Sequence, residues 1–303
     1  MTPEVTAATI AAITSICLFF LQYISTLLYD NYSLSRRLET EYTFQQTKTI
    51  KEEIAKTKTP LLQASEELNH RLWNLIKTID EKWLEKPQEQ WTEKDSHYIQ
   101  SFVYRWLKVI YRVIQTETAV NNLDITLADK RDLLYLKYVK AIKHSLCDRE
   151  LLKSLDYKIT DTYNHFYVDE LENFADFLNE DDAPIPFHDF KEKITTSYTA
   201  VEKVFSFFSK VEDNEKNKSL NLLRSLHLIL ISFLNTFGIE YQKTSKKKSN
   251  KLFNKHDYRE LFIGKEAIKF MAKHKIENEI NTFIRRLNKR PSLWNRLKSW
   301  WKG

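Results

Sequence analysis

Uncharged and mostly apolar residues run without interruption through positions 5–29, a stretch of 25 residues. As a helix this stretch spans about 37 Å, which is enough to cross a bilayer core of about 30 Å with some tilt. A cleavable signal peptide and a buried soluble helix are the alternatives. The leader before the stretch has no lysine or arginine and no small-x-small cleavage site follows, which disfavours a signal peptide. The pattern predicts an uncleaved transmembrane helix at residues 5–29, after a short extracytoplasmic N-terminus at residues 1–4.

Beyond this stretch the apolar residues recur at steps of three and four, the period of amphipathic helices. Residues 30–58 are more polar and predict a helical stalk, or a coiled coil if the chain self-associates. Pro60 predicts the start of a new helix, which would end at Pro87. The apolar face of that helix is expected to consist of Leu61, Ala64, Leu68, Leu72, Leu75, Ile76, Ile79 and Trp83.

Helical patterns continue along the rest of the chain. Thr92 and Asp95 resemble a capping box before the next helix. The expected helices cover residues 99–114, 129–146, 149–157, 168–178, 189–211 and 219–237, and the clearest loop covers residues 179–188. There is no alternating strand pattern of useful length. The sequence therefore predicts an all-α fold, with a stalk at residues 30–58, a cytoplasmic helical domain at residues 59–240 and a basic tail at residues 241–303.

Residues 219–237 are apolar nearly all round and could form a second membrane span. Only 15 uncharged residues separate Arg224 from Glu240, fewer than the roughly 17 that crossing a bilayer requires. A second crossing would also carry the basic tail outside, against the positive-inside bias. This stretch is therefore predicted to be the central buried helix of the bundle.

The charges are divided unevenly along the chain. Residues 243–303 hold 18 lysines and arginines against 5 acidic residues, whereas the preceding residues hold 29 against 36. Arg36, Arg37 and Lys48 follow the apolar stretch and no cation precedes it. By the positive-inside bias the N-terminus lies outside and the bulk of the chain is cytoplasmic. The two cysteines are far apart and fit no disulfide framework, as expected in a reducing compartment.

The basic tail ends in a predicted amphipathic helix. Interfacial helices combine tryptophan and leucine on one face with flanking cations. The expected membrane-interface residues are Trp294, Leu297, Trp300, Trp301, Arg296 and Lys298. Docking of the tryptophans on the bundle is an alternative interpretation. Binding of nucleic acid is a weaker one, because no recognised binding module surrounds them.

A string at residues 60–74 reads P-L-L-x-A, then L-x-x-R-L-x-N, and its members are Pro60, Leu61, Leu62, Ala64, Leu68, Arg71, Leu72 and Asn74. It resembles the hallmark of an uncharacterised bacterial family of single-pass, membrane-anchored helical proteins. The resemblance covers about residues 55–180 and implies a helical cytoplasmic domain at the bacterial inner membrane, with no activity to carry over. A looser likeness of residues 104–152 to membrane-associated phage abortive-infection proteins implies a link to bacterial defence.

Few residues carry candidate chemistry. The chain has only 3 glycines, too few for phosphate-binding loops or dinucleotide-binding turns. Glu67 and His70 have the spacing of a di-metal carboxylate motif, but no second copy exists and His70 points away from the apolar face. Arg71 and Asn74 flank that face. They are expected to be a half-buried arginine paired with an acidic residue of a neighbouring helix, and a cap of a backbone group.

No histidine follows an arginine at the spacing typical of HEPN-type ribonucleases, and no serine or cysteine has a nucleophile-elbow context. His165 with Asp169 and Glu170 is explained by a solvated helix start. The predicted function is a membrane-anchored interaction or effector module without a catalytic, cofactor or metal site. Its predicted partners are the lipid bilayer, a second copy of the chain or another protein. The alternatives are a divergent nuclease effector acting through His165 or His227, and a membrane-tethered nucleic-acid binder, which is disfavoured.

Overall fold

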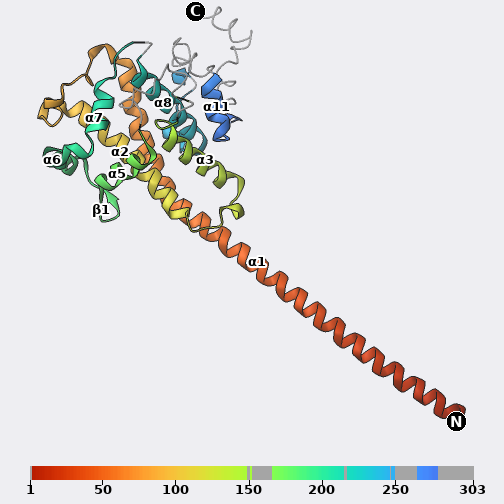
Figure 1. The fold of residues 1–303 in the computed structure, drawn as a ribbon. Coiled ribbons are helices and arrows are strands. Elements are labelled where there is room, and N and C mark those ends of the chain that lie inside the picture. Colours follow the sequence, from red (N-terminus) through yellow and green to blue (C-terminus); the bar gives the residue numbers. More distant parts are fainter. Residues whose placement is uncertain are drawn as a thin grey trace, which may run out of the picture. The chain divides into compact units, whose positions relative to one another are not determined.

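The protein is built from α-helices joined by short turns (Figure 1). The computed structural model describes residues 2–148, 151, 166–214, 217–245, 247–249 and 265–278. Helix accounts for 81% of these residues and strand for 2%, so the predicted all-α class is confirmed. The chain divides into two compact units, one of Met1–Glu52 with Leu123–Ala128 and one of Glu53–Asn122 with Asp129–Gly303. All but one residue of the helix predicted at 149–157 lie outside the described residues.

The first unit contains the greater part of helix α1, which extends over Pro3–Lys77 and continues into the second unit. Residues 30–58, which were expected to be helical, are part of this helix. A short 3-10 turn, η4 at Ile125–Leu127, completes this unit. The hydroxyl of Thr47 donates to the carbonyl of Leu127 at 3.4 Å, and Asp124 caps the turn by accepting from the Thr126 amide at 3.1 Å.

Pro60 does not begin a helix, contrary to the prediction, because α1 continues through it. The proline ring holds φ near −65°, which a helix accepts, but it removes one backbone hydrogen bond and crowds the carbonyl four residues earlier. Packing on the C-terminal side keeps the helix continuous, since Leu61, Ala64 and Leu68 are all fully buried. The predicted apolar face of this segment is thus present, but it belongs to a longer helix.

The same helix ends at Lys77. The sequence predicted its end at Pro87, ten residues later. Thr78 leaves the helical region with φ −124°, and Lys82 adopts a left-handed φ of 56°. The chain then passes through three 3-10 turns, η1 at Ile79–Glu81, η2 at Gln88–Gln90 and η3 at Lys94–Ser96. Trp83 lies in this irregular segment and is 44% exposed, so its predicted place on the buried face is wrong.

Helix α2, His97–Val120, lies at the centre of the second unit and packs against α3, α5, α6 and α7. Most of its predicted apolar face is buried: Ile99, Phe102, Val103, Trp106, Ile110 and Val113. The capping box expected at Thr92 and Asp95 is not at the helix start. Ser96 occupies the N-cap position, and its hydroxyl donates to the Gln90 carbonyl at 2.6 Å instead of capping the helix.

Helix α3, Lys130–His144, begins where predicted, because Asp129 caps it by accepting from the amides of Arg131 and Asp132. Helix α5, Val168–Leu178, also agrees with its predicted range. The loop after it forms a small hairpin. Strand β1, Asn179–Glu180, pairs antiparallel with β2, Ala183–Pro184, across a turn of two residues. Asp181 and Asp182 both have positive φ, as a type I′ turn requires.

The single helix predicted at residues 189–211 is wrong, because the segment is broken into α6 at Phe187–Ser197, η6 at Tyr198–Ala200 and α7 at Glu202–Ser209. Hydroxyl side chains compete for backbone carbonyls and weaken a helix end. Thr195 donates to the Glu192 carbonyl at 2.7 Å and Thr196 to the Lys193 carbonyl at 3.1 Å. Because of the break, α6 and α7 each bury an apolar face of their own, with Phe190 and Ile194 on α6 and Phe205 and Phe208 on α7.

Helix α8, Lys218–Phe237, contains the long apolar stretch, and its most apolar window is 83% buried. Tyr135 and Tyr138 of α3 contact the rings of Phe233 and Phe237. The Tyr138 hydroxyl also hydrogen-bonds the Ser232 hydroxyl at 2.6 Å. Burial of this kind is what the sequence predicted for a central helix of the bundle.

Helix α11, Lys265–Lys273, is the last helix of the described chain, and its end lies against the end of α3. His274 and His144 have ring centroids 5.3 Å apart. Lys273 forms an ion pair of 2.5 Å with Asp148, whose side chain is 2% exposed. These contacts attach part of the basic tail to the helical domain.

Candidate functional site

The most conspicuous surface of the first unit is the apolar face of α1. Large apolar side chains on residues 5–29 are all 45% or more exposed, and none of the most apolar window of this helix is buried. Among the described residues, α1 and α8 are long and apolar enough to cross a membrane, judged by length and composition. Only α1 combines that composition with exposed side chains. The candidate anchor is therefore residues 5–29.

The residues just after this stretch form an amphipathic strip on α1. Tyr29, Tyr32, Arg36, Arg37 and Phe44 line a shallow surface together. The guanidinium of Arg36 lies 4.9 Å from the centroid of the Tyr32 ring. Aromatic rings next to cations are typical of side chains at a membrane–water interface.

The family-string residues divide into packing and polar positions. Leu61, Leu62 and Leu68 are buried, and Pro60 is half-buried. They therefore belong to the core of the second unit. Asn74 is exposed, and its carbonyl accepts from the Thr78 hydroxyl at 3.0 Å; the structure gives its side chain no capping contact among the described residues.

Arg71 is half-buried, as predicted, but its partner is not the expected acidic residue. Its Nη2 donates to Ser101 Oγ on α2 at 2.7 Å, and its guanidinium lies 4.8 Å from the centroid of the Tyr98 ring. Arg105 Nη1 donates to the same Ser101 Oγ and to the Ser101 carbonyl at 3.1 Å. Two guanidinium groups therefore converge on one hydroxyl.

Other charged groups surround this convergence. Lys108 donates to both oxygens of Glu67 at 3.0 Å. Burial lowers the pKa of Arg105, and the nearby Arg71 guanidinium lowers it further. The pKa of His97 is lowered by burial and then by the charges of Arg71, Lys191 and Arg105. Arg71, Arg105 and Lys191 thus act together on His97, while the charge of Lys108 is paired with Glu67.

Ser101 and Arg105 were not among the residues singled out from the sequence. Both lie on a helix whose other residues are mostly apolar, and a cation inside such a pattern is the signal that could have drawn attention to Arg105. Their closeness to Arg71 could not be read from spacing, because 30 residues and three irregular turns separate Ser101 from Arg71.

His70 is exposed, as predicted from its position opposite the apolar face. Its Nε2 is 3.6 Å from Glu66, and the His70 side chain is 62% exposed. Glu67, the carboxylate of the predicted di-metal spacing, is bound by Lys108 instead. These two residues are therefore not brought together in a metal-binding arrangement.

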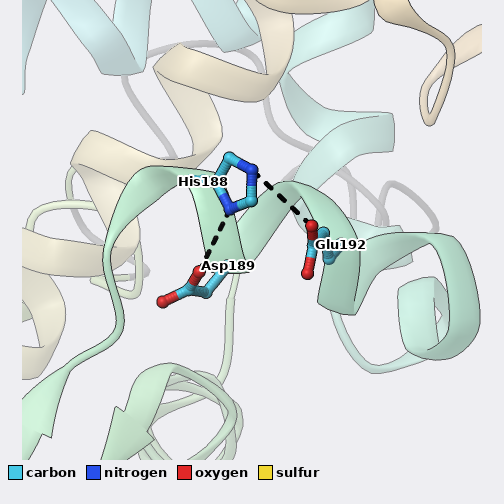
Figure 2. Close-up of side chains that lie close together, drawn as sticks. All are labelled: His188, Asp189 and Glu192. Carbon is cyan, nitrogen blue, oxygen red and sulfur yellow. Dashed lines mark hydrogen bonds and ion pairs between the residues drawn. The ribbon is translucent and has the colours of Figure 1, made fainter.

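Among the described residues, one group of three side chains has atoms close enough to hold a metal ion: His188, Asp189 and Glu192, near the start of α6 (Figure 2). All three are exposed. Asp189 faces His188 Nδ1 at 3.2 Å and Glu192 faces His188 Nε2 at 3.6 Å. A metal ion would take one ring nitrogen, whereas here each ring nitrogen of His188 faces a different carboxylate.

The nuclease alternative depends on His165 or His227. His227 on α8 is fully buried, with its ring edge-on to Trp73 at 4.9 Å between centroids. Burial lowers its pKa to about 3, so it stays neutral and has no access to a substrate. His165 lies outside the described residues. Glu170 accepts from the Tyr167 amide at 2.8 Å and pairs with Lys203 at 2.7 Å, which agrees with a structural role at a helix start.

The predicted interface residues of the tail, Trp294, Leu297, Trp300, Trp301, Arg296 and Lys298, also lie outside the described residues. No family model, no curated protein and no solved structure matches this chain.

Proposed function

We propose that this chain is a single-pass protein of the bacterial inner membrane, anchored by residues 5–29 with its N-terminus outside. The observation that carries the proposal is the exposure of every large apolar side chain in this stretch of α1, with no part of its most apolar window buried. Exposed apolar area of this extent is costly in water and favourable in lipid. Arg36 and Arg37 lie within ten residues after the stretch and support the orientation.

The helical domain after the anchor is proposed to act by binding, as an interaction or effector module in the cytoplasm. The buried aromatic core supports a stable domain, and the charged surface around Arg71 supports a partner-binding role. The proposal includes a link to bacterial defence, which rests on the sequence resemblance. It also includes association with a second copy of the chain, and contact of the tail tryptophans with the inner leaflet, which rests on the composition of the tail.

Fractionation of cells that express the full-length chain tests the anchor. We expect the wild-type protein to stay in the membrane pellet after an alkaline wash. Ile16→Arg combined with Phe20→Arg should move it to the soluble fraction, because each arginine at the centre of a span costs about 2.5–3.5 kcal/mol in insertion.

The matched control is Ile16→Leu combined with Phe20→Leu, which changes the same positions and keeps them apolar. This variant should remain in the pellet. Wild-type protein that is fully soluble without detergent would overturn the anchor.

A further inference from the structure

Arg71 and Arg105 of the helical domain carry more N–H donors than the neighbouring oxygen atoms accept. Arg71 and Arg105 share Ser101 Oγ as a side-chain acceptor. A guanidinium carries five N–H donors, and these two residues use only a few of them. Both side chains are only half-buried, and none of their nitrogen atoms is among the buried polar atoms that lack a hydrogen-bond partner. Part of each side chain therefore stays open to an acceptor from outside the chain.

The positive charges of Arg71 and Arg105 are also not balanced by a carboxylate of their own. In the part of the chain that the structure describes, no carboxylate lies within ion-pair distance of Arg71 or Arg105. Glu67, whose charge acts on Arg105, already receives two hydrogen bonds from Lys108. Like charges held close together in a half-buried place destabilise one another unless an anion compensates them.

Lys191 lies near the same place, because its Nζ is 5.5 Å from the centroid of the Phe187 ring, which packs edge-on against His97. The charges of both arginines and of Lys191 act on His97, which is exposed at the start of α2. Lys191 comes from α6, so three helices contribute positive charge. An anion with more than one negative charge suits this arrangement better than a single carboxylate.

We propose that Arg71 and Arg105 bind a phosphate monoester group, with the Ser101 hydroxyl holding the two guanidinium groups in place when the ligand is absent. Arginine forks match the oxygens of phosphate bidentately. Inorganic phosphate, a nucleoside monophosphate and the headgroup of phosphatidate all present the required chemistry. The proposal goes beyond membrane anchorage and does not depend on it.

An aromatic surface next to the pair favours the nucleoside monophosphate among these sources. The Tyr98 ring lies beside Arg71, and Trp83 contacts Tyr98 edge-on at 5.0 Å between centroids. Trp83 is 44% exposed. An exposed indole can stack on a base regardless of its identity.

The test measures the melting temperature and the ligand affinity of the full-length chain in detergent micelles. Sodium phosphate and adenosine monophosphate are each compared with sodium chloride at equal ionic strength. A ligand that binds the folded state and not the unfolded chain raises the melting temperature, and the rise grows with the ratio of ligand concentration to Kd. In a separate arm, nanodiscs of phosphatidylcholine with and without phosphatidate distinguish a lipid headgroup from a free phosphate.

We expect phosphate or the nucleotide to raise the melting temperature above that in chloride, and Arg71→Gln and Arg105→Gln to weaken binding about ten-fold or more. Arg112→Gln is the matched control, since it removes the same charge from α2 at a guanidinium that donates to Gln115 and lies over Tyr111. Its affinity should stay within about two-fold of wild type.

The variant Ser101→Ala tests whether Arg71 and Arg105 form a ligand site or only stabilise the fold. Without the shared hydroxyl the melting temperature should fall in chloride and recover when phosphate is added, since the anion replaces the lost acceptor. If a glutamine variant fails to fold, Arg71→Lys and Arg105→Lys replace it, and they should weaken binding because they keep the charge but lose the fork. Equal melting temperatures in phosphate, nucleotide, phosphatidate and chloride would overturn the proposal, as would unchanged affinity in the arginine variants.

Discussion

His227 shows how one buried side chain sets a pH dependence for the whole domain. The folded chain keeps this imidazole neutral down to about pH 3, whereas an exposed histidine takes up a proton near pH 6.5. Between these values the unfolded state binds more protons, so the free energy of unfolding falls as the pH falls from about 6.5 towards 3. Above about pH 7 the group contributes no pH dependence. Burial also lowers the pKa of His274, to about 4, which adds in the same direction.

We therefore expect His227→Leu to flatten the dependence of unfolding free energy on pH by up to about 1.4 kcal/mol per pH unit between pH 4 and 6. Denaturant or thermal unfolding of the full chain in detergent at several pH values measures this slope. His70→Gln, which removes an exposed imidazole, is the control and should keep the wild-type slope. An unchanged slope in His227→Leu would contradict the assigned burial.

At the scale of single residues, the sequence predicted how exposed a side chain is better than which residue it contacts. The exposure of His70 and the half-burial of Arg71 both follow from their angles around one helix. The partner of Arg71 does not, because an acidic residue and a serine on the facing helix are equally compatible with that angle. The contact with Ser101 depends on how α2 is packed.

At the scale of elements, the continuity of α1 at Pro60 leads to a further prediction. Pro60→Ala should raise the free energy of unfolding by about 1–3 kcal/mol, because alanine restores a backbone donor inside a helix. Urea unfolding of the detergent-solubilised chain measures this change.

Pro87→Ala is the matched control for this change. Pro87 lies outside a helix, with φ −63° and ψ 155° before η2. Proline there restricts the unfolded chain at no cost to the fold, so its loss should lower the free energy of unfolding by up to about 1 kcal/mol. Effects of the same sign at both positions would contradict the continuous helix.

The existence of most helices could be predicted from the sequence, and several ends could not. The start of α3 agrees with the range predicted from the apolar pattern, and in the structure Asp129 caps it, which is a local interaction. The end of α1 at Lys77 and the break after Ser197 were missed. Both depend on a balance between weak local preferences, such as those of the Thr195 and Thr196 hydroxyls, and the packing of apolar faces, and local helix preference alone does not set that balance.

For the whole molecule, the distribution of cations predicts the topology. Protease added to intact spheroplasts should leave the chain after the anchor undigested, and a reporter fused after Gly303 should behave as a cytoplasmic protein. Arg36→Glu combined with Arg37→Glu should reduce the fraction in this orientation, because cations close to the end of a span determine it.

Lys82→Glu combined with Lys86→Glu makes the same change in charge more than 50 residues after the apolar stretch, and should not affect orientation. Digestion of the large C-terminal part from outside would contradict the predicted topology.

The amino-acid sequence by itself determined the helical class, the apolar stretch at residues 5–29 and the faces on which Leu61, Leu68 and Leu72 lie. These features depend on the helical period and on the length of an uncharged run, both of which are local. Only the tertiary structure decided that α1 continues through Pro60 and ends at Lys77, since the burial of Leu61, Ala64 and Leu68 in the domain favours a continuous helix over a break. It also decided that Arg71 and Arg105 meet at Ser101, because contacts between distant residues form only when helices pack.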